Sequence, residues 1–407
     1  MKTAGMWLFV VPAAVLGLAG CGNSINNGSG TGTGTGTGAG NGSIGSTDQG
    51  NRAASASTQS GLMAQKGGMT LSDVAHMNPL GAAFNPRSEL AASDPRAAKL
   101  AALRRAMVAD VSRAAAEYRA VGTRATTTCP TSGTRTINDV TDGLTQVRTV
   151  TITYANCRNG THSTNGPATL VLTPGDGSIQ LGDGVGGATT ADLVVTTYPD
   201  STSTTKLNEY LVDLNVSGPF STTGTAFNVT GSGAEKYIDY VNGVAGDTFT
   251  LTLSGLSMSG TATVPAPGKT VFSVTYNGAI TESWTGGSPD GSVTAQTGSA
   301  SVTFTAFTVE ETVETGKVTW TMMGHVVTDF TPNMCGEGDF SIATPVPVVR
   351  LANGSFVQGQ VTVNAPAVTV TYGPNSSNIA VNVNGTTTGY SPASFEAMCD
   401  ISPSGLL

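Results

Sequence analysis

The sequence predicts an all-β protein: a many-stranded antiparallel meander curled into a barrel or a two-layer sheet, with one N-terminal amphipathic helix. Three observations support this fold class. Runs of β-branched and aromatic residues alternate with Thr or Ser from residue 125 to near the end of the chain. Clusters of Gly, Pro, Asn and Asp separate these runs. A clear helical period precedes the first run, and no second one interrupts the strands.

The predicted strands alternate an apolar with a hydroxyl side chain, as in the run TFTLTL at residues 248–253. This period of two places one face against a core and the other toward water. We expect about twelve to sixteen strands, which is more than one flat twisted sheet comfortably holds. The clearest runs are residues 148–154, 168–172, 192–198, 209–216, 248–253, 269–276, 299–309, 316–330, 339–343, 358–363, 367–372 and 378–383.

The connections between these runs carry turn residues and no helical pattern. Without helical crossovers, neighbouring strands pair antiparallel and mostly in sequence order. A transmembrane barrel would use the same alternation with its apolar face outward. Aromatic residues make up only 6% of the chain and do not gather at strand ends, which argues against that alternative.

One amphipathic helix is predicted between residues 93 and 122. Ser93 and Asp94 offer capping side chains, Pro95 suits a first helical turn, and Gly122 supplies a C-terminal stop. The apolar face comprises Leu100, Leu103, Met107, Val111, Ala114, Ala115 and Tyr118.

Charge predicts where this helix docks. Residues 87–124 carry a net charge of +4, whereas residues 125–407 carry −13. We expect the apolar face to pack on the β domain, with the helix arginines near its carboxylates. The alternative is that the basic face meets anionic lipid or another envelope polymer.

The N-terminus has the parts of a secretory signal: Lys2, an apolar run from Met6 to Leu18, and small residues after it. The apolar run is too short to span a bilayer. The sequence Leu18-Ala19-Gly20-Cys21 resembles the signal of bacterial lipoproteins. The resemblance implies removal of residues 1–20, acylation of Cys21 with palmitate-type chains, and a lipid anchor in the membrane.

The residue after the lipid anchor predicts the membrane to which the protein is sorted. Gly22 stands where lipoproteins retained at the inner membrane usually carry Asp, so the resemblance implies the cell outer membrane. Whether the domain is periplasmic or surface-exposed stays open.

Residues 21–68 are predicted to be the lipidated cysteine and a flexible tether. They consist mostly of Gly, Ser, Thr, Asn and Ala, with Thr-Gly repeats at residues 31–38, and hold too little apolar area to offset the entropy of ordering. Such a coil has a root-mean-square span of roughly 35 to 40 Å. Residues 69–124 then form the helical segment and residues 125–407 the antiparallel β domain.

An even number of cysteines follows the anchor, which in an exported chain predicts disulfides. Cys129 and Cys157 each lie fourteen residues from Gly143, in the turn signal Asp142-Gly143, so they should meet across a hairpin. That leaves Cys335 to pair with Cys399. A zinc site lacks both a C-x-x-C pair and a nearby His doublet, so no metal ligands are predicted.

The opening Cys129-Pro130-x-x-Gly133-Thr134, followed by TITYANCRNG at residues 151–160, loosely resembles uncharacterised β-rich exported proteins of Gram-negative bacteria. The resemblance implies the same fold class and carries no activity.

Residues with catalytic chemistry form no recognisable motif. Residues 182–187 satisfy G-x-G-x-x-G, but a strand rather than a helix follows them, so a glycine-rich loop is the better interpretation. Asp176 and Asp183 offer too few oxygens for Ca²⁺. Asp329, four extended residues or roughly 13 Å beyond His325, is too far away to orient that imidazole. Glu310, Glu311 and Glu314 are expected in a solvated turn rather than as a glycosidase pair.

The sequence therefore predicts a non-catalytic, membrane-anchored lipoprotein that presents a β domain for adhesion, envelope structure or partner binding. Its expected partners are the membrane, through the lipid anchor, and a protein or glycan; no cofactor is expected. The acidic β domain disfavours nucleic acid. The alternatives are a carrier barrel for an apolar ligand and, with less support, an enzyme acting on envelope glycans.

Overall fold

The computed structural model describes residues 44–75, 95–117, 125–173, 176–218, 226–286, 296–331, 336–352, 355–373 and 379–397. All of them belong to one compact unit, residues 39–407. Within these ranges, none of the helices combines the length and the apolar character needed to cross a bilayer.

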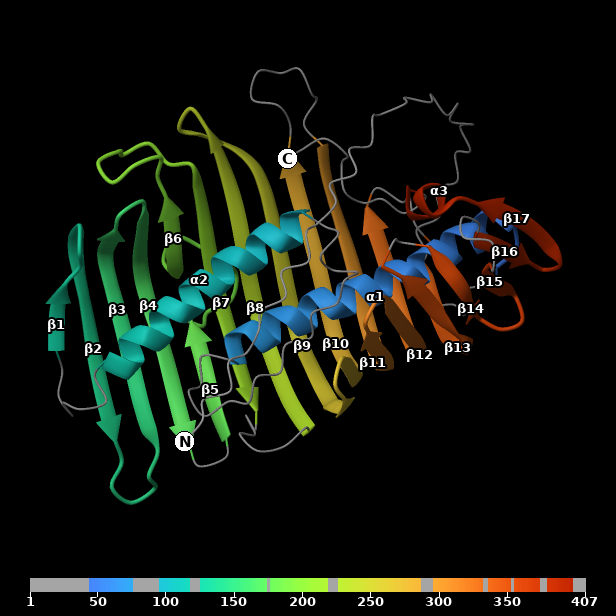
Figure 1. The fold of residues 1–407 in the computed structure, drawn as a ribbon. Coiled ribbons are helices and arrows are strands. Elements are labelled where there is room, and N and C mark those ends of the chain that lie inside the picture. Colours follow the sequence, from blue (N-terminus) through green and yellow to red (C-terminus); the bar gives the residue numbers. More distant parts are fainter. Residues whose placement is uncertain are drawn as a thin grey trace. The chain divides into compact units, whose positions relative to one another are not determined.

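Within the described residues, seventeen strands form one sheet in which all pairings are antiparallel and almost all join chain neighbours (Figure 1). Strands β5 and β6 are the exception, because they lie end to end between β4 and β7. The strands are β1 Ala125–Thr128, β2 Ser132–Thr141, β3 Arg148–Asn159, β4 His162–Thr173, β5 Asp176–Leu181, β6 Leu193–Thr197, β7 Asn208–Gly218, β8 Ala226–Val241, β9 Val244–Ala266, β10 Lys269–Gly286, β11 Gln296–Glu314, β12 Lys317–Thr331, β13 Gly338–Leu351, β14 Phe356–Val363, β15 Val368–Tyr372, β16 Ile379–Val383 and β17 Thr386–Tyr390.

The predicted all-β class and the sequential antiparallel pairing are confirmed. Strands β1 and β17 lie at opposite ends of the sheet in Figure 1, and two helices, rather than a second sheet, pack on one face. Each predicted run lies within or overlaps a strand. Strand β8 has no clear alternation because Gly231, Gly233 and Glu235 occupy positions where its neighbours carry apolar groups.

The part of the chain that the structure describes contains three helices, α1 Thr47–Ala75, α2 Pro95–Glu117 and the short α3 Pro392–Ala397. Helix α2 confirms the predicted helix, and its buried residues include Leu100, Met107 and Val111. Positions 93, 94, 118 and 122 of that prediction lie outside the described residues.

Helix α1 corrects the predicted tether. The segment expected to be flexible up to residue 68 is helical from Thr47, and Ser46 caps it by accepting a hydrogen bond from the Gln49 amide. Its Gly, Ala and Ser content gives weak intrinsic helicity. Packing against the sheet stabilises α1 instead, because its small residues let the helix backbone approach the strands closely. A Cβ on Gly67 would lie 2.3 Å from Ile280 Cδ1, and one on Gly50 would lie 2.4 Å from Val383 Cγ1.

The two long helices lie across the strands and partly beside each other (Figure 1). Helix α1 contacts every strand from β7 to β16, and α2 continues over the sheet to β3. The lengths agree: 29 residues of α1 rise about 43 Å at 1.5 Å each. Nine gaps between ten strands, about 4.8 Å each, also give about 43 Å. The core therefore lies between this pair of helices and one face of the sheet.

Bulges in β3, β9 and β11 break the register at similar heights along the strands, each at one residue with a left-handed backbone: Asn156, Gly255 and Ala306. In β11 the Ala306 amide donates to Asn277 Oδ1 on β10 at 2.8 Å. On the other side, β12 carries Gly324, where a Cβ would lie 2.5 Å from the Ala306 carbonyl oxygen. Bulges of this kind bend a sheet, here along a line that crosses the strands.

Candidate functional site

The predicted pairing of Cys129 with Cys157 is confirmed by a disulfide with a Cα–Cα distance of 5.3 Å. The two cysteines were expected to face each other across the base of one hairpin, but Cys129 does not lie on a strand of that hairpin. Cys129 lies in the turn between β1 and β2, where its amide donates to the Gly133 carbonyl at 3.0 Å. The bond therefore fixes that turn to β3. Cys21, Cys335 and Cys399 lie outside the described residues.

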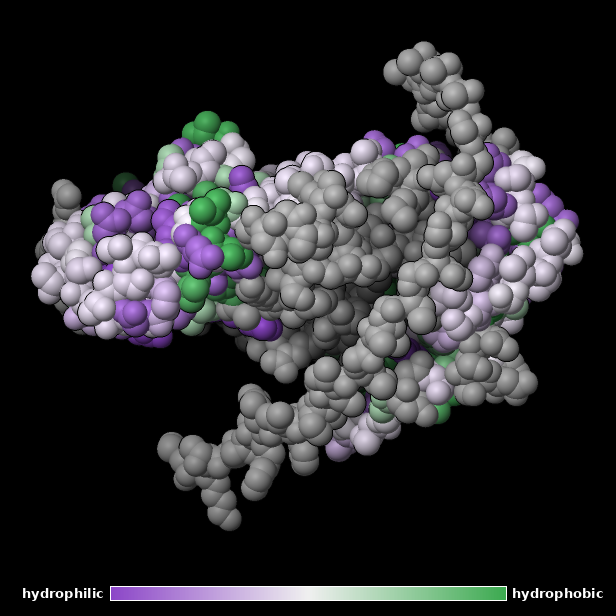
Figure 2. Space-filling view, turned by 90° about the horizontal axis from the view of Figure 1, so that it is seen from above, coloured by the Kyte–Doolittle hydropathy of each residue, from purple (hydrophilic) through white to green (hydrophobic). Residues whose placement is uncertain are grey.

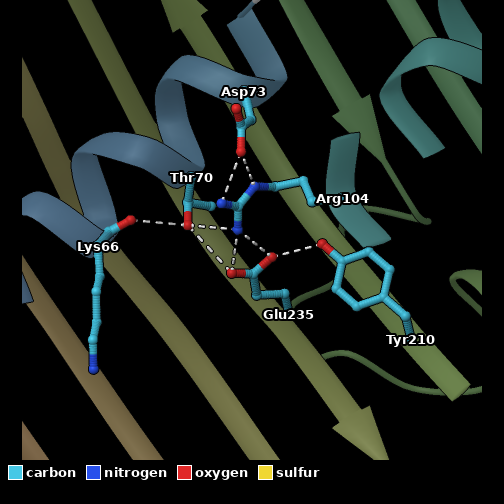
Figure 3. Close-up of polar contacts among 6 residues, drawn as sticks. All are labelled: Lys66, Thr70, Asp73, Arg104, Tyr210 and Glu235. Carbon is cyan, nitrogen blue, oxygen red and sulfur yellow. Dashed lines mark hydrogen bonds and ion pairs between the residues drawn. The ribbon is translucent and has the colours of Figure 1, made fainter. Parts of the chain in front are cut away.

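A cluster of charged side chains is buried where α1 and α2 meet the sheet (Figure 3). Arg104 on α2 is at its centre, with 3% of its surface exposed. Its guanidinium lies 2.7 Å from Glu235 Oε1 on β8 and 2.9 Å from Asp73 Oδ2 on α1. It also donates to Thr70 Oγ1 at 2.9 Å. One arginine thus joins both helices to the sheet.

A tyrosine and a second ion pair lie next to this cluster. The Tyr210 hydroxyl donates to Glu235 Oε2 at 2.6 Å. Lys66 on α1 lies 2.9 Å from Glu282 Oε1 on β10. The space left among these residues is about 20 Å³, room for roughly one water. Because the charges are paired with one another, we assign this network to attachment of the helices rather than to catalysis.

The pKa values of the network reflect this pairing. Burial by itself would lower the pKa of Arg104, but Glu235 and Asp73 outweigh it and leave that pKa raised, so the guanidinium stays charged. Burial and the neighbouring Glu235 carboxylate raise the pKa of Tyr210 well above its ordinary value. The tyrosine therefore remains a hydrogen-bond donor at any physiological pH.

Three carboxylates meet where β5 ends and β6 begins. Ligand atoms of Asp183, Asp192 and Asp213 all lie within 4.8 Å of one another. Asp213 accepts hydrogen bonds from the Gly184 and Gly186 amides at 3.0 and 2.6 Å. Asp192 likewise accepts bonds from the amides of Asp183 and Thr189.

These bonds assign the carboxylates a structural role, which is to hold the loop of residues 182–192. Burial raises the pKa of Asp213. Burial also opposes ionisation of Asp192, but the hydrogen bonds from Thr189 and Asp183 outweigh it and lower that pKa. Asp176, the other carboxylate considered for Ca²⁺, lies at the far end of β5.

A cavity of about 430 Å³ opens between α2 and the ends of β1 to β4 and β6. Its charged lining consists of Arg113 and Asp110 from α2 and Arg135 from β2, with His162 from β4 beside them. Met107 and Val195 supply apolar wall, and the Cys129–Cys157 disulfide forms another part of it.

The face of the sheet opposite α1 and α2, here called the helix-free face, carries rows of mostly hydroxyl and amide side chains. Figure 2 looks from above onto the strand ends rather than onto this face, and it shows pale and hydrophilic atoms over most of the coloured surface there. Three rows in register are Asn138-Thr151-Thr169-Gln180-Asn215-Ser232, Thr252-Thr281-Ser301-Asp329 and Thr362-Thr369-Asn382-Thr387.

No family model matches this chain. Neither a curated protein nor a solved structure matches it. Nothing in these comparisons indicates an enzyme family.

The other residues considered for chemistry do not converge. Glu310 lies on the helix-free face and Glu311 on the buried face, because successive side chains alternate, and Glu314 pairs with Lys269 and Lys317. His325 contacts Asp339 on the neighbouring strand, not Asp329.

Sequence reasoning missed Arg104 and Glu235 as partners. The charge difference between the two segments indicated an attraction, and the helical period places Arg104, but not the exposed Arg105, on the face of Leu100 and Met107. No local signal indicates which carboxylate Arg104 meets. The start of α1 did leave a signal, since Ser46 and Gln49 have the spacing of a capping box. Gln49 Oε1 accepts a bond from the Gly45 amide at 3.0 Å.

Proposed function

We propose that this chain is an outer-membrane lipoprotein, acylated at Cys21, that presents its β domain to a protein or glycan partner without catalysing a reaction. The observation that carries the proposal is the contrast between the two faces of the sheet. One face is filled by packed side chains and paired charges under α1 and α2. The helix-free face presents rows composed mostly of neutral hydrogen-bonding groups.

Such a face suits a partner that offers many neutral donors and acceptors, as sugars and peptide backbones do. Thr281 lies between Thr252 and Ser301 in one row, and its hydroxyl donates to Ser301 at 3.1 Å. Exchange of such hydroxyl contacts for contacts with a partner costs less than desolvation of charges would. The face is therefore proposed as the binding surface.

Of the alternatives, a carrier for an apolar ligand has less support because the space at the centre of the helix–sheet interface is about 20 Å³. An enzyme acting on envelope glycans has less support because Glu310 and Glu311 point to opposite faces.

Anchoring is tested by metabolic labelling with a palmitate analogue in the wild type and in Cys21→Ser. We expect label in the membrane fraction for the wild type, and unlabelled protein in the soluble fraction for the variant. Equal labelling of both proteins would disprove acylation at Cys21.

The binding surface is tested by photo-crosslinking in intact cells, with p-benzoylphenylalanine in place of Thr281 or Thr369 on the helix-free face. Arg105, exposed on α2, is the matched control position. We expect adducts from the first two positions and none from the third. Adducts from Arg105 alone would place the partner on the helix side instead. Protease shaving of intact and permeabilised cells then reports which side of the membrane displays the domain.

A further inference from the structure

The cavity beside α2 has a composition that stands out in this chain. The chain carries a net charge of −8, yet the described part of the lining combines two arginines and one histidine with a single carboxylate, Asp110. Its volume of about 430 Å³ is within the range of small-molecule sites, roughly 300 to 1,000 Å³.

The two arginines come from different layers of the fold. Arg113 projects from α2 with 60% of its side chain exposed, and its nearest approach to Asp110 is a loose 3.8 Å. Arg135 projects from β2 on the helix-facing side, where Ile137 is also buried. Among the described residues, the carboxylate paired with Arg113 is this distant one, and an anion that enters the cavity meets a second cation, Arg135, from the sheet.

The remaining lining favours a molecule with an apolar part. Met107 and Val195 are both buried residues that contribute to the wall. Three threonines and an asparagine also line the cavity. A ligand with an anionic head and a short apolar body would therefore find a complement for each part.

We propose that this cavity binds a small organic anion, with a carboxylate or phosphate group directed at Arg113 and Arg135 and an apolar portion against Met107 and Val195. This inference is independent of the anchor and of the helix-free face. The same chemistry has two sources, a free metabolite or the headgroup of an anionic lipid.

The test uses the histidines as reporters, because the chain has only three. His162 lines the cavity, whereas His325 lies on the helix-free face. Full-length protein in neutral detergent is titrated with hexanoate, with hexyl phosphate and, as the neutral analogue, with hexanol, while the imidazole signals are followed by NMR. His162→Gln assigns the cavity signal.

We expect saturable shifts of the His162 signal with both anions, no shift of His325, and weaker binding of hexanol. Arg113→Gln and Arg135→Gln should each weaken anion binding about tenfold, the effect of losing a charged hydrogen bond. Arg105→Gln, a change of the same kind on the exposed side of α2, is the control and should bind as the wild type does. Unchanged far-ultraviolet circular dichroism shows that each variant is folded.

A second titration separates the two sources. Mixed micelles with phosphatidylglycerol that compete with hexyl phosphate, while phosphatidylcholine micelles do not, would identify a lipid headgroup. Competition by neither would leave the free anion as the ligand. The proposal is overturned by the absence of saturable binding of both anions, by equal affinity for hexanol, or by an equal loss in Arg105→Gln.

Discussion

Arg104 Nη1 lies 2.7 Å from Glu235 Oε1, a contact that joins α2 to the middle of the sheet across 131 positions of sequence. Both side chains are almost fully buried. A buried pair of this kind requires that each charge keeps its partners, because desolvation is costly and only close pairing offsets it. The attachment of the helices therefore depends on a small number of residues.

Replacement of Arg104 by Met should lower the free energy of unfolding by about 3 to 5 kcal/mol, since it leaves Glu235 and Asp73 buried without their cation. Urea denaturation measures the change. Arg105→Met, one position along on the exposed side of α2, should change stability by no more than about 0.5 kcal/mol. A loss in Arg104→Met as small as that of the control would show that the network contributes nothing.

Gly67→Ala should destabilise the protein, although alanine favours an isolated helix by about 1 kcal/mol over glycine. The reason is the 2.3 Å approach of a new Cβ to Ile280 Cδ1. Thermal unfolding measures the effect. Ile280→Val removes Cδ1, so in that background the alanine should cost less. A stabilising effect of Gly67→Ala in the wild type would mean that α1 does not pack this closely.

Ala306→Gly should stabilise the protein by about 1 kcal/mol, because a left-handed backbone costs roughly that much for a residue with a Cβ. The φ angle of Ala306 is 46°. Asn277→Ala should have the opposite effect, since it removes the acceptor of the Ala306 amide. Chemical denaturation of both variants measures the change in the free energy of unfolding, which should be positive for Ala306→Gly and negative for Asn277→Ala. Loss of stability in Ala306→Gly would contradict the left-handed backbone at the bulge.

Removal of the disulfide with Cys129→Ser and Cys157→Ser should cost about 3 to 4 kcal/mol, the entropy of a loop closed across 28 positions. Differential scanning calorimetry of the double variant measures it. The β1–β2 turn should lose protection from hydrogen exchange first, because the bond holds that turn against β3. Equal protection of the turn in both proteins would show that hydrogen bonding alone fixes it.

Glu209 should make stability depend on pH in a defined direction. Burial opposes its ionisation, but hydrogen bonds from Lys206 and Tyr240 outweigh burial and lower the pKa of Glu209. A lowered folded-state pKa contributes stability above the ordinary value of 4.5, and that contribution is lost as the pH falls through the folded-state pKa. The stability of Glu209→Gln should therefore fall less than that of the wild type as the pH is lowered.

The partner tyrosine provides an independent readout at alkaline pH. Burial and the hydrogen bond to Glu209 raise the pKa of Tyr240 from 10.0 to about 12. Stability that depends on neutral Tyr240 is fully present below 10.0 and is lost as the pH rises toward 12. Tyrosinate absorbance should show an earlier titration in Glu209→Gln, with Tyr240→Phe as the assignment control. Identical titration curves would contradict the contact.

Patterns within the sequence were enough to predict the all-β class, the antiparallel order, the amphipathic helix and the pairing of Cys129 with Cys157. Each of these follows from local periodicity or from spacing along the chain, which neighbouring residues encode. The acidic β domain and the basic helical segment also indicated docking of α2, but not the residue that makes the contact.

The helical state of residues 47–68, the partners of Arg104 and the cavity beside α2 depend instead on contacts between distant segments. Gly50 and Gly67 suggested a flexible coil, because propensity is a local property. In the folded protein, the missing side chains let α1 approach the sheet, so the same glycines favour helix packing. Which carboxylate meets Arg104, and where a cavity remains, depend on the relative placement of distant segments, and no local pattern encodes that placement.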